Sequence, residues 1–370
     1  MKILFVLEYY YPHIGGVEIL FQKLAEETVK RGNQVMVVTI KLPGTKHREY
    51  INGVEIIRLR MPKIGIRYWF TFLTFFKLVK YVNNFDIIHT TTYNAALPSW
   101  LAAKIFRKKI IITIHEVWGK LWMKIPDMIY VSKILHRFYE FLVVNLVYDL
   151  IITVSNFTKN VLNKNNVKTI HSGIDNNLFN RSKYIDKSKE IRTKLKFDLS
   201  FIALYFGRPG WAKGLEFFVQ AIPEIKKQIP NFKAVLLVSK EPAKKYYNTI
   251  ELIKQLQIKD NVTILDPVAR GDLPAYLLLA DCIVVPSISE GFGFNVAEAS
   301  ALEIPIVATN AGSIPEVISG NFILVEPQNP EELAHGVINM YNNKKITVTN
   351  KKVFNWEKSV DEYMKSYTSL

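Results

Sequence analysis

The sequence contains very little cysteine and no long apolar run. Its only cysteine, Cys282, lies in the apolar segment CIVVP, so it cannot form an intrachain disulfide and is expected to be a buried structural thiol. No run reaches the roughly 18–20 apolar residues that a membrane-spanning helix needs. The first residues, MKILFVLEYYYP, are interrupted by Glu8 and Pro12 and do not resemble a secretion signal. A cytoplasmic location is therefore expected.

Two motifs of nucleotide chemistry are missing. No Asp-x-Asp pair occurs, so no metal ion is expected to neutralise a bound diphosphate. The glycine turn YPHIGGVE does not have the GxGxxG form, and the strand after it ends in Lys41, where an NAD site has an acidic residue for the ribose. The missing GxGxxG turn and the missing acidic residue after the second strand argue against an NAD-linked oxidoreductase on a doubled Rossmann frame, which we keep as an alternative.

Acidic residues are scarce in the first half of the chain. Residues 1–170 carry 24 Lys and Arg against 11 Asp and Glu, a net charge of +13, whereas residues 171–370 carry 24 against 22, a net charge of +2. A lysine-rich genomic composition would explain this excess, and so would contact with an anionic membrane or nucleic acid. A nucleic-acid-binding protein is the weaker alternative, because the ligand motifs described below lie mostly in the nearly neutral half.

Apolar runs alternate with amphipathic stretches throughout the chain, which is typical of α/β proteins with mainly parallel sheets. The pattern predicts two similar doubly wound domains, 1–171 and 199–351. The intervening segment 172–198 includes the polar stretch 176–198, which lacks apolar periodicity, and is predicted to be a linker. Paired domains of this type bind ligands in the cleft between the carboxyl ends of their sheets.

The segment SEGFGFNVAE places two carboxylates around a glycine turn. It follows the predicted strand 282–286, and a helix is expected to start near Asn295. The backbone amides of 291–295 would then lie at a helix N-terminus and could bind an anion or sugar hydroxyls. Glu290 and Glu298 could accept hydrogen bonds from vicinal hydroxyls of one ligand. The same pattern would arise from a glycine turn in which one Glu is exposed to solvent and the other only interacts favourably with the helix dipole.

Other candidate ligand-binding residues also follow predicted strands. Arg208 and Lys213 in FGRPGWAKG supply two cations beside a helix start, which suits a diphosphate. Gly15 and Gly16 form the first strand-to-helix turn, and His115 ends the strand of ITIHE. Two surface cations and a structural histidine remain the simpler interpretations of these residues.

Taken together, these segments resemble the retaining nucleotide-sugar glycosyltransferases of family 4, which have the two-domain GT-B fold. EGFGFNVAE matches the family's E-x7-E motif, FGRPGWAKG its GR…KG element, and YPHIGGVE its N-terminal glycine loop. TIHSGIDNNLF resembles the segment at the domain junction, with Ser172 in place of Asn. The resemblance covers nearly the whole chain and implies two Rossmann-like domains facing across a deep cleft, with a C-terminal helix in 352–370 completing the first domain.

The resemblance also implies roles for individual residues. Arg208 and Lys213 would bind and stabilise the diphosphate leaving group, and Glu298 would accept hydrogen bonds from the ribose. Glu290 and His115 would lie beside the transferred sugar. The remaining donor contacts would come from the glycine loop of the first domain, the loop expected to face the base, and the turn of the second domain: Gly15, Gly16, Val268, Gly291, Phe292, Gly293, Phe294 and Asn295. No cofactor or metal is implied.

The sequence departs from the family pattern at two places. SKEP (239–242) replaces a usual Gly-x-Gly-Pro turn, and Glu303 stands at a usual glycine. The acceptor is suggested by segments 63–85 and 120–148, where aromatic residues mix with Arg and Lys. These segments are either buried core helices or interfacial helices on an anionic membrane. In the second case the protein is peripheral at the inner face of the membrane, and its acceptor is a lipid-linked molecule or a growing glycan.

Overall fold

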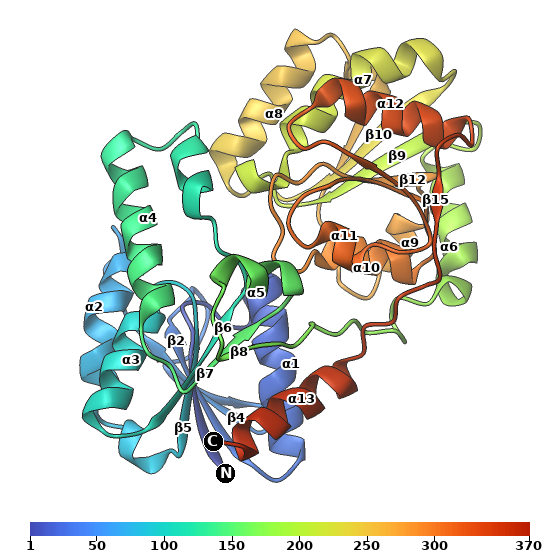
Figure 1. Cartoon of the computed structure of the whole chain (residues 1–370). Helices are drawn as coiled ribbons and strands as arrows, with labels where there is room; N and C mark the ends of the chain where they lie inside the picture. The colour runs from blue at the N-terminus through green and yellow to red at the C-terminus, as the bar shows by residue number, and fades with distance from the viewer. The chain divides into compact units, whose positions relative to one another are not determined.

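The computed structural model describes all 370 residues and divides into two compact units. We call Met1–Gly173 with Trp356–Leu370 the N-terminal domain, and Ile174–Asn355 the C-terminal domain. Each contains one sheet, mostly parallel, with helices on both faces (Figure 1). The prediction of two doubly wound α/β domains is confirmed. None of the helices is both long and apolar enough to cross a bilayer.

The sheet of the N-terminal domain has eight strands in the order β3-β4-β2-β1-β5-β6-β7-β8. Only the edge strand β3 is antiparallel to its neighbour. Most of the other strands are buried on both faces, which explains their continuous runs of Ile, Leu and Val. The strands are β1 (Lys2–Val6), β2 (Gln34–Ile40), β3 (Arg48–Ile51), β4 (Val54–Leu59), β5 (Ile87–Thr91), β6 (Lys109–Ile114), β7 (Leu150–Thr153) and β8 (Val167–Thr169).

The helices of the N-terminal domain lie on opposite faces of its sheet (Figure 1). One face is covered by α2 (Ile66–Leu78), α3 (Ala96–Ile105) and α4 (Tyr130–Asn145), whose buried residues join the core around Leu4 and Ile112. The other face carries α1 (Gly16–Lys30), α5 (Asn156–Leu162) and α13 (Trp356–Thr368). Two short 3-10 helices complete the domain: η1 (Val82–Asn84) follows α2, and η2 (Gly119–Lys124) precedes α4.

Hydrogen bonds attach the C-terminal helix α13 to this sheet. The fully buried ring of His89 on β5 lies 2.7 Å from the hydroxyl of Tyr367 through Nδ1 and 2.8 Å from the hydroxyl of Thr113 through Nε2. Where the chain leaves the N-terminal domain, a Cβ on Gly173 would lie 2.3 Å from the backbone nitrogen of Trp356. This crowding accounts for the glycine in the segment TIHSGIDNNLF.

The C-terminal domain has a seven-stranded sheet in the order β11-β10-β9-β12-β13-β14-β15, with only β15 antiparallel. One apolar core lies between this sheet and residues of α7, α8 and α12, and it includes the buried thiol of Cys282 as predicted. The strands are β9 (Phe201–Gly207), β10 (Phe232–Val238), β11 (Val262–Leu265), β12 (Cys282–Val285), β13 (Ile306–Thr309), β14 (Asn321–Val325) and β15 (Thr347–Val348). The α-helices are α6 (Arg181–Lys194), α7 (Leu215–Gln228), α8 (Ala243–Gln255), α9 (Leu273–Leu277), α10 (Phe294–Ala301), α11 (Ile314–Val317) and α12 (Pro330–Tyr341).

The prediction of a linker over 172–198 is wrong, because most of this segment is the helix α6 of the C-terminal domain. Its start is capped by Asn180, whose side chain accepts a hydrogen bond from the backbone N–H of Ser182 at 3.1 Å. Polar contacts hold the helix in place: the Arg192 guanidinium donates to Asp281 and to the carbonyl of Leu279. Polar anchoring of this kind leaves no apolar period in the sequence, so the pattern could not indicate a helix.

Candidate active site

The glycine turn of the C-terminal domain joins β12 to α10. The helix begins at Phe294, next to the predicted start at Asn295. Gly293 precedes it in the left-handed conformation, with φ of +82°. Few residues other than glycine adopt this conformation readily, so the turn can reverse sharply at the carboxyl end of the strand. The first backbone hydrogen bond within α10 runs from the N–H of Ala297 to the carbonyl of Gly293 at 3.1 Å, so the amides before Ala297 lie at a helix start, where ligands are commonly bound.

Glu290 is held in the turn as a buried, paired carboxylate. Its side chain is 6% exposed, and its Oε1 accepts hydrogen bonds from the Lys213 ammonium at 2.7 Å and from the Ser287 hydroxyl at 2.8 Å. The alternative of a solvent-exposed Glu at this position is therefore wrong. Lys213 remains 36% exposed, so its ammonium can still face a ligand. Two of the predicted site residues are thus in direct contact.

The loop that carries Arg208 and Lys213 is fastened to the segment before the glycine turn. The backbone N–H of Ile288 donates to the carbonyl of Ala212 at 2.8 Å. Gly214 has φ of +62°, and a Cβ there would lie 2.0 Å from the carbonyl oxygen of Pro286. The glycine of the KG pair is therefore required both by its backbone conformation and by this close approach. Arg208 lies at the exposed end of β9, with its carbonyl accepting from the Tyr205 hydroxyl at 3.0 Å.

A second glycine turn, missed by the sequence analysis, fixes the backbone of Glu290. The backbone N–H and the hydroxyl of Ser313 both donate to the Glu290 carbonyl, at 3.0 and 3.1 Å. Gly312 has φ of +57°, and a Cβ there would lie 2.4 Å from the Glu290 carbonyl oxygen and 2.7 Å from its nitrogen. The residues NAGS at 310–313 lie beyond the matched motif EGFGFNVAE, and their position in the sequence alone does not show that they pack on Glu290.

This packing predicts that Gly312→Ala lowers the free energy of unfolding by an unusually large amount. Gly320→Ala is the matched control, because Gly320 also has a positive φ, of +85°, but nothing lies within 4 Å of a Cβ there. The control should lose about 1–2 kcal/mol of unfolding free energy from backbone strain alone. Gly312→Ala should lose about 1–3 kcal/mol more, because Glu290 must shift. Chemical denaturation measures both. Equal losses in the two variants would contradict the close contact.

Glu298 lies one turn into α10 and is buried. The residue is only 3% exposed and pairs with Arg270, whose guanidinium lies 2.5 Å from its Oε1. Burial raises the pKa of Glu298, and the charge and hydrogen bond of Arg270 oppose that rise. Arg270 itself lies 4.8 Å from the ring centroid of Phe179. No motif in the sequence indicated Arg270, which belongs to the loop between β11 and α9.

The remaining predicted residues of this domain lie in the same turn or in the loop that carries Arg270. Phe292 is buried and its ring meets that of Phe294 edge-on, with centroids 5.2 Å apart. The side chain of Asn295 accepts from the backbone N–H of Val296 at 3.0 Å. Gly291 and Val268 are half-buried. A ligand contact at each of these residues stays a prediction.

The predicted residues of the N-terminal domain lie at a helix start and at a strand end. Gly15 directly precedes α1 and Gly16 is its first residue, whereas His115 directly follows β6. Burial lowers the pKa of His115 to about 4, against the opposing charge of Glu18, so its ring is neutral at neutral pH. The Nε2 atom of His115 is buried without a hydrogen-bond partner. Glu18, on the first turn of α1, is paired with His13 Nδ1 at 2.9 Å.

The structure explains one departure from the family pattern. Glu303 has φ of +58°, a left-handed conformation that glycine adopts without strain, and its carboxylate pairs with Lys351 at 3.1 Å. The other departure, at Ser239–Pro242, forms the turn between β10 and α8. There the Ser239 hydroxyl donates to the carbonyl of Glu241 at 2.6 Å.

Comparison with known proteins identifies the class. The model of "Glycosyltransferase Family 4" matches residues 14–178, and that of "Glycosyl transferases group 1" matches residues 186–356. The chain is 28% identical to an uncharacterised glycosyltransferase of Methanocaldococcus jannaschii over 352 residues, which cover 91% of this chain and 88% of the relative. These matches and the two Rossmann-like domains define a glycosyltransferase of the GT-B fold. The chain belongs to the family 4 glycosyltransferases.

Two more distant proteins are similar over the full length of this chain. The GPI3 subunit of phosphatidylinositol N-acetylglucosaminyltransferase from Saccharomyces cerevisiae is 22% identical over 395 residues, covering 100% of this chain and 83% of the relative. The structure of Anabaena HepE in complex with UDP-glucose has a TM-score of 0.76 at 18% identity and is covered completely in both chains. The likeness to HepE shows the shared fold.

Proposed function

We propose that the protein transfers a hexose from a UDP- or GDP-linked sugar to an acceptor held at a membrane surface, with retention at the anomeric carbon. The observation that carries the proposal is the ion pair between Lys213 and Glu290. Lys213 lies in the same loop as Arg208, and this loop is hydrogen-bonded to the segment before the glycine turn that carries Glu290. Two cations beside a helix start suit a diphosphate, and a buried carboxylate suits sugar hydroxyls. The complex of HepE with UDP-glucose supports a nucleotide-sugar donor.

In this proposal the leaving group provides the base. The bond between the anomeric carbon and the diphosphate oxygen breaks, and a bond to the acceptor oxygen forms on the same face of the sugar. The acceptor proton passes to the departing diphosphate, whose negative charge Arg208 and Lys213 stabilise. Direct attack by the acceptor is favoured over a covalent intermediate on Glu290, because the Oε1 of Glu290 already accepts hydrogen bonds from Lys213 and Ser287. The proposed role of Glu290 is to hold sugar hydroxyls, with neutral His115 as a further polar contact.

Glu298 would bind the ribose in this scheme, with Arg270 keeping its carboxylate ionised. The amides of 291–295 would add donors to the sugar and phosphate. The resemblance assigns further donor contacts to Gly15, Gly16 and Val268. The acceptor is proposed to be a lipid-linked molecule or a growing glycan, reached by peripheral binding at the inner face of the membrane. The name of the yeast GPI3 relative, a phosphatidylinositol-modifying subunit, supports a membrane-held acceptor.

A thermal-shift screen tests the donor proposal. The ligands are UDP, GDP, ADP, UDP-glucose, GDP-mannose and NAD, each added to the whole protein. We expect a UDP or GDP ligand to raise the melting temperature, because a ligand that binds only the folded state stabilises it. Stabilisation by NAD alone would contradict a nucleotide-sugar donor.

Transfer is expected to proceed without a divalent cation. Arg208 and Lys213 supply the positive charge that a metal ion supplies in Asp-x-Asp enzymes, and the sequence contains no such pair. Activity with the donor from the screen should be unchanged, within about twofold, after EDTA treatment. Loss of activity in EDTA with recovery only on addition of Mg²⁺ or Mn²⁺ would show that this expectation is wrong.

A further inference from the structure

Two helices on one face of the N-terminal domain expose large apolar side chains in a regular pattern. On α2, Trp69, Phe72 and Phe76 are 44%, 66% and 67% exposed. Exposed large apolar residues of soluble proteins usually occur singly, but these recur at the three- and four-residue spacing of one helix face. On and directly before α4, the exposed apolar residues are Ile129, Tyr130, Val131, Ile134, Leu135, Phe138 and Phe141.

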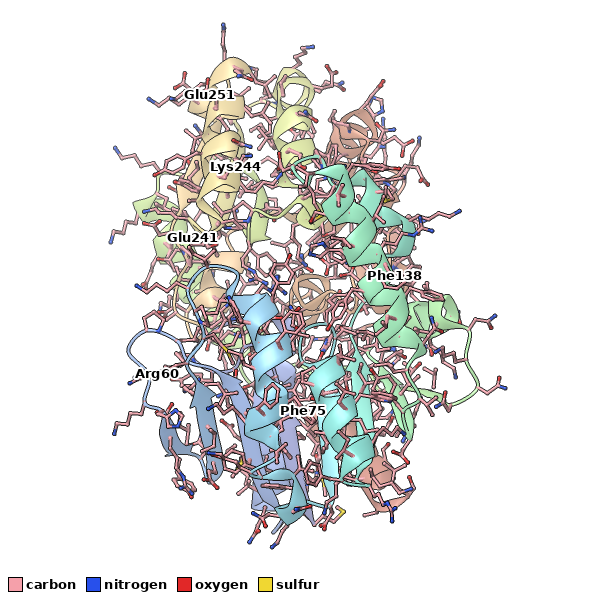
Figure 2. The ribbon with its side chains drawn as sticks, turned by 90° about the vertical axis from the view of Figure 1, so that its left-hand side faces the viewer. Arg60, Phe75, Phe138, Glu241, Lys244 and Glu251 are labelled. Carbon is pink, nitrogen blue, oxygen red and sulfur yellow. The ribbon has the colours of Figure 1, made fainter.

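Core packing does not account for this pattern. The two helices bury other residues against the sheet, including Phe70 and Leu78 of α2 and Val143 of α4. The helices are joined at the surface, because the Tyr68 hydroxyl lies 3.3 Å from Nε2 of His136. Figure 2 looks onto this face, and labels Arg60 beside α2 and Phe138 on α4. The two exposed patterns therefore belong to one surface.

A basic pocket of about 460 Å³ opens beside the exposed aromatic residues of α2. It is lined by His47, Leu59, Arg60, Lys77, Lys80 and Tyr81. Three of these six side chains are full cations, and no carboxylate pairs with any of them. The nearby acids are engaged elsewhere, Glu49 with Arg58 and Glu55 with Arg48.

The charge around the pocket favours an anionic occupant. Residues 60–82 contain five Arg and Lys and no Asp or Glu. Unpaired like charges in one concave site raise the local concentration of anions. The exposed residues Phe76 and Lys77 are consecutive on the last turn of α2 and Lys80 follows its end, so the apolar and the basic surfaces adjoin there.

We propose that this face docks on a bilayer containing anionic phospholipid. The aromatic and aliphatic side chains of α2 and α4 enter the interface, and the pocket of His47, Arg60, Lys77 and Lys80 receives a headgroup phosphate. Docking would bring the proposed transferase to a membrane-held acceptor, so the biological role of this surface rests on the proposed function. Vesicle binding and nucleotide binding are measured separately, so either can fail alone.

Two other occupants fit the surface less well. A second copy of the chain, packed face to face, would bring the same unpaired cations together across the interface. Nucleic acid would satisfy the cations, but it would leave Ile134, Leu135 and Phe138 of α4 in water. A bilayer satisfies the charged and the apolar parts together.

The test is sedimentation of the whole protein with phosphatidylcholine vesicles, with and without phosphatidylglycerol. The wild type should bind the anionic vesicles at low salt and be released at high salt. Lys77→Gln/Lys80→Gln should weaken this binding about tenfold or more, and Lys226→Gln/Lys227→Gln in α7 is the charge-matched control that should not. Phe72→Ser/Phe76→Ser should weaken binding at every salt concentration at which the wild type still binds. Arg67 is left intact, although it also lies on α2, because it is bonded to the buried carboxylate of Glu8.

Nucleotide affinity, measured by calorimetry, should be the same in all four proteins and confirms that they are folded. The proposal is overturned if the wild type ignores anionic vesicles at low salt, or if both variants of α2 bind them as the wild type does. It is also overturned if the α2 variants change only the oligomeric state of the protein. Nucleotide binding that persists in any of these cases leaves the donor proposal standing.

Discussion

Replacing Lys213 with alanine is expected to lower kcat for sugar transfer about 100-fold or more. In the proposed mechanism the Lys213 ammonium stabilises charge that develops on the departing diphosphate, and removal of one such group typically costs two to three powers of ten in rate. Arg208 remains in the variant and provides the residual activity. Transfer assays at saturating donor measure the effect, and an unchanged kcat would rule out this role for Lys213.

The same substitution also removes the ion pair to Glu290. A carboxylate that is 6% exposed would keep only the Ser287 hydroxyl as a side-chain donor to its Oε1, so about 2 kcal/mol of unfolding free energy should be lost. The double variant Lys213→Ala/Glu290→Gln replaces the buried charge by a neutral amide. It should recover most of the stability and none of the activity. Recovery of activity with stability would show that Lys213 acts only by supporting the fold.

The second large effect concerns Glu298 and its dependence on pH. Glu298→Gln is expected to weaken nucleotide binding about tenfold or more, because charge-assisted hydrogen bonds to the ribose are lost. Burial raises the pKa of the wild-type carboxyl group, so its binding contribution should decline as the pH is lowered through that raised pKa. Arg270→Ala removes the group that opposes the rise. In that variant the decline should begin at a higher pH than in the wild type.

Calorimetric titrations with the nucleotide from the thermal-shift screen, at several pH values, distinguish these variants. In Glu298→Gln the decline of nucleotide affinity that comes from protonation of Glu298 should be absent, whereas in Arg270→Ala it should be shifted to higher pH. The same pH profile of nucleotide affinity in the wild type and both variants would show that this ion pair has no part in nucleotide binding. Unfolding measured in parallel shows whether either variant is merely destabilised.

The alternation of strands and helices could be predicted from the sequence because the parallel strands are buried on both faces. Runs such as KIIITI and CIVV therefore appear as continuous apolar segments. The short edge strands β3 and β15 are mostly exposed and polar, and they left no such signal. Helix α6 could not be predicted, because one side-chain cap and an arginine hold it, without an apolar stripe.

The candidate site was predicted in part. The glycine turn, its two carboxylates and the cations of FGRPGWAKG lie close in the sequence to strand ends, where parallel sheets bind ligands. The contacts that bury them come from distant segments: Ser313 bonds to Glu290, and Arg270 bonds to Glu298. Spacing along one chain cannot show such pairings, so the sequence did not indicate how deeply the two glutamates are buried.

Calorimetry of the whole protein with UDP and GDP, comparing the wild type with Lys213→Ala/Glu290→Gln, tests the central claim most directly. The account predicts that one of the two nucleotides binds the wild type and that the double variant binds it at least about tenfold more weakly, with a similar unfolding free energy. Binding of neither nucleotide to the wild type, or equal affinity in the two proteins, would contradict a donor site at the glycine turn.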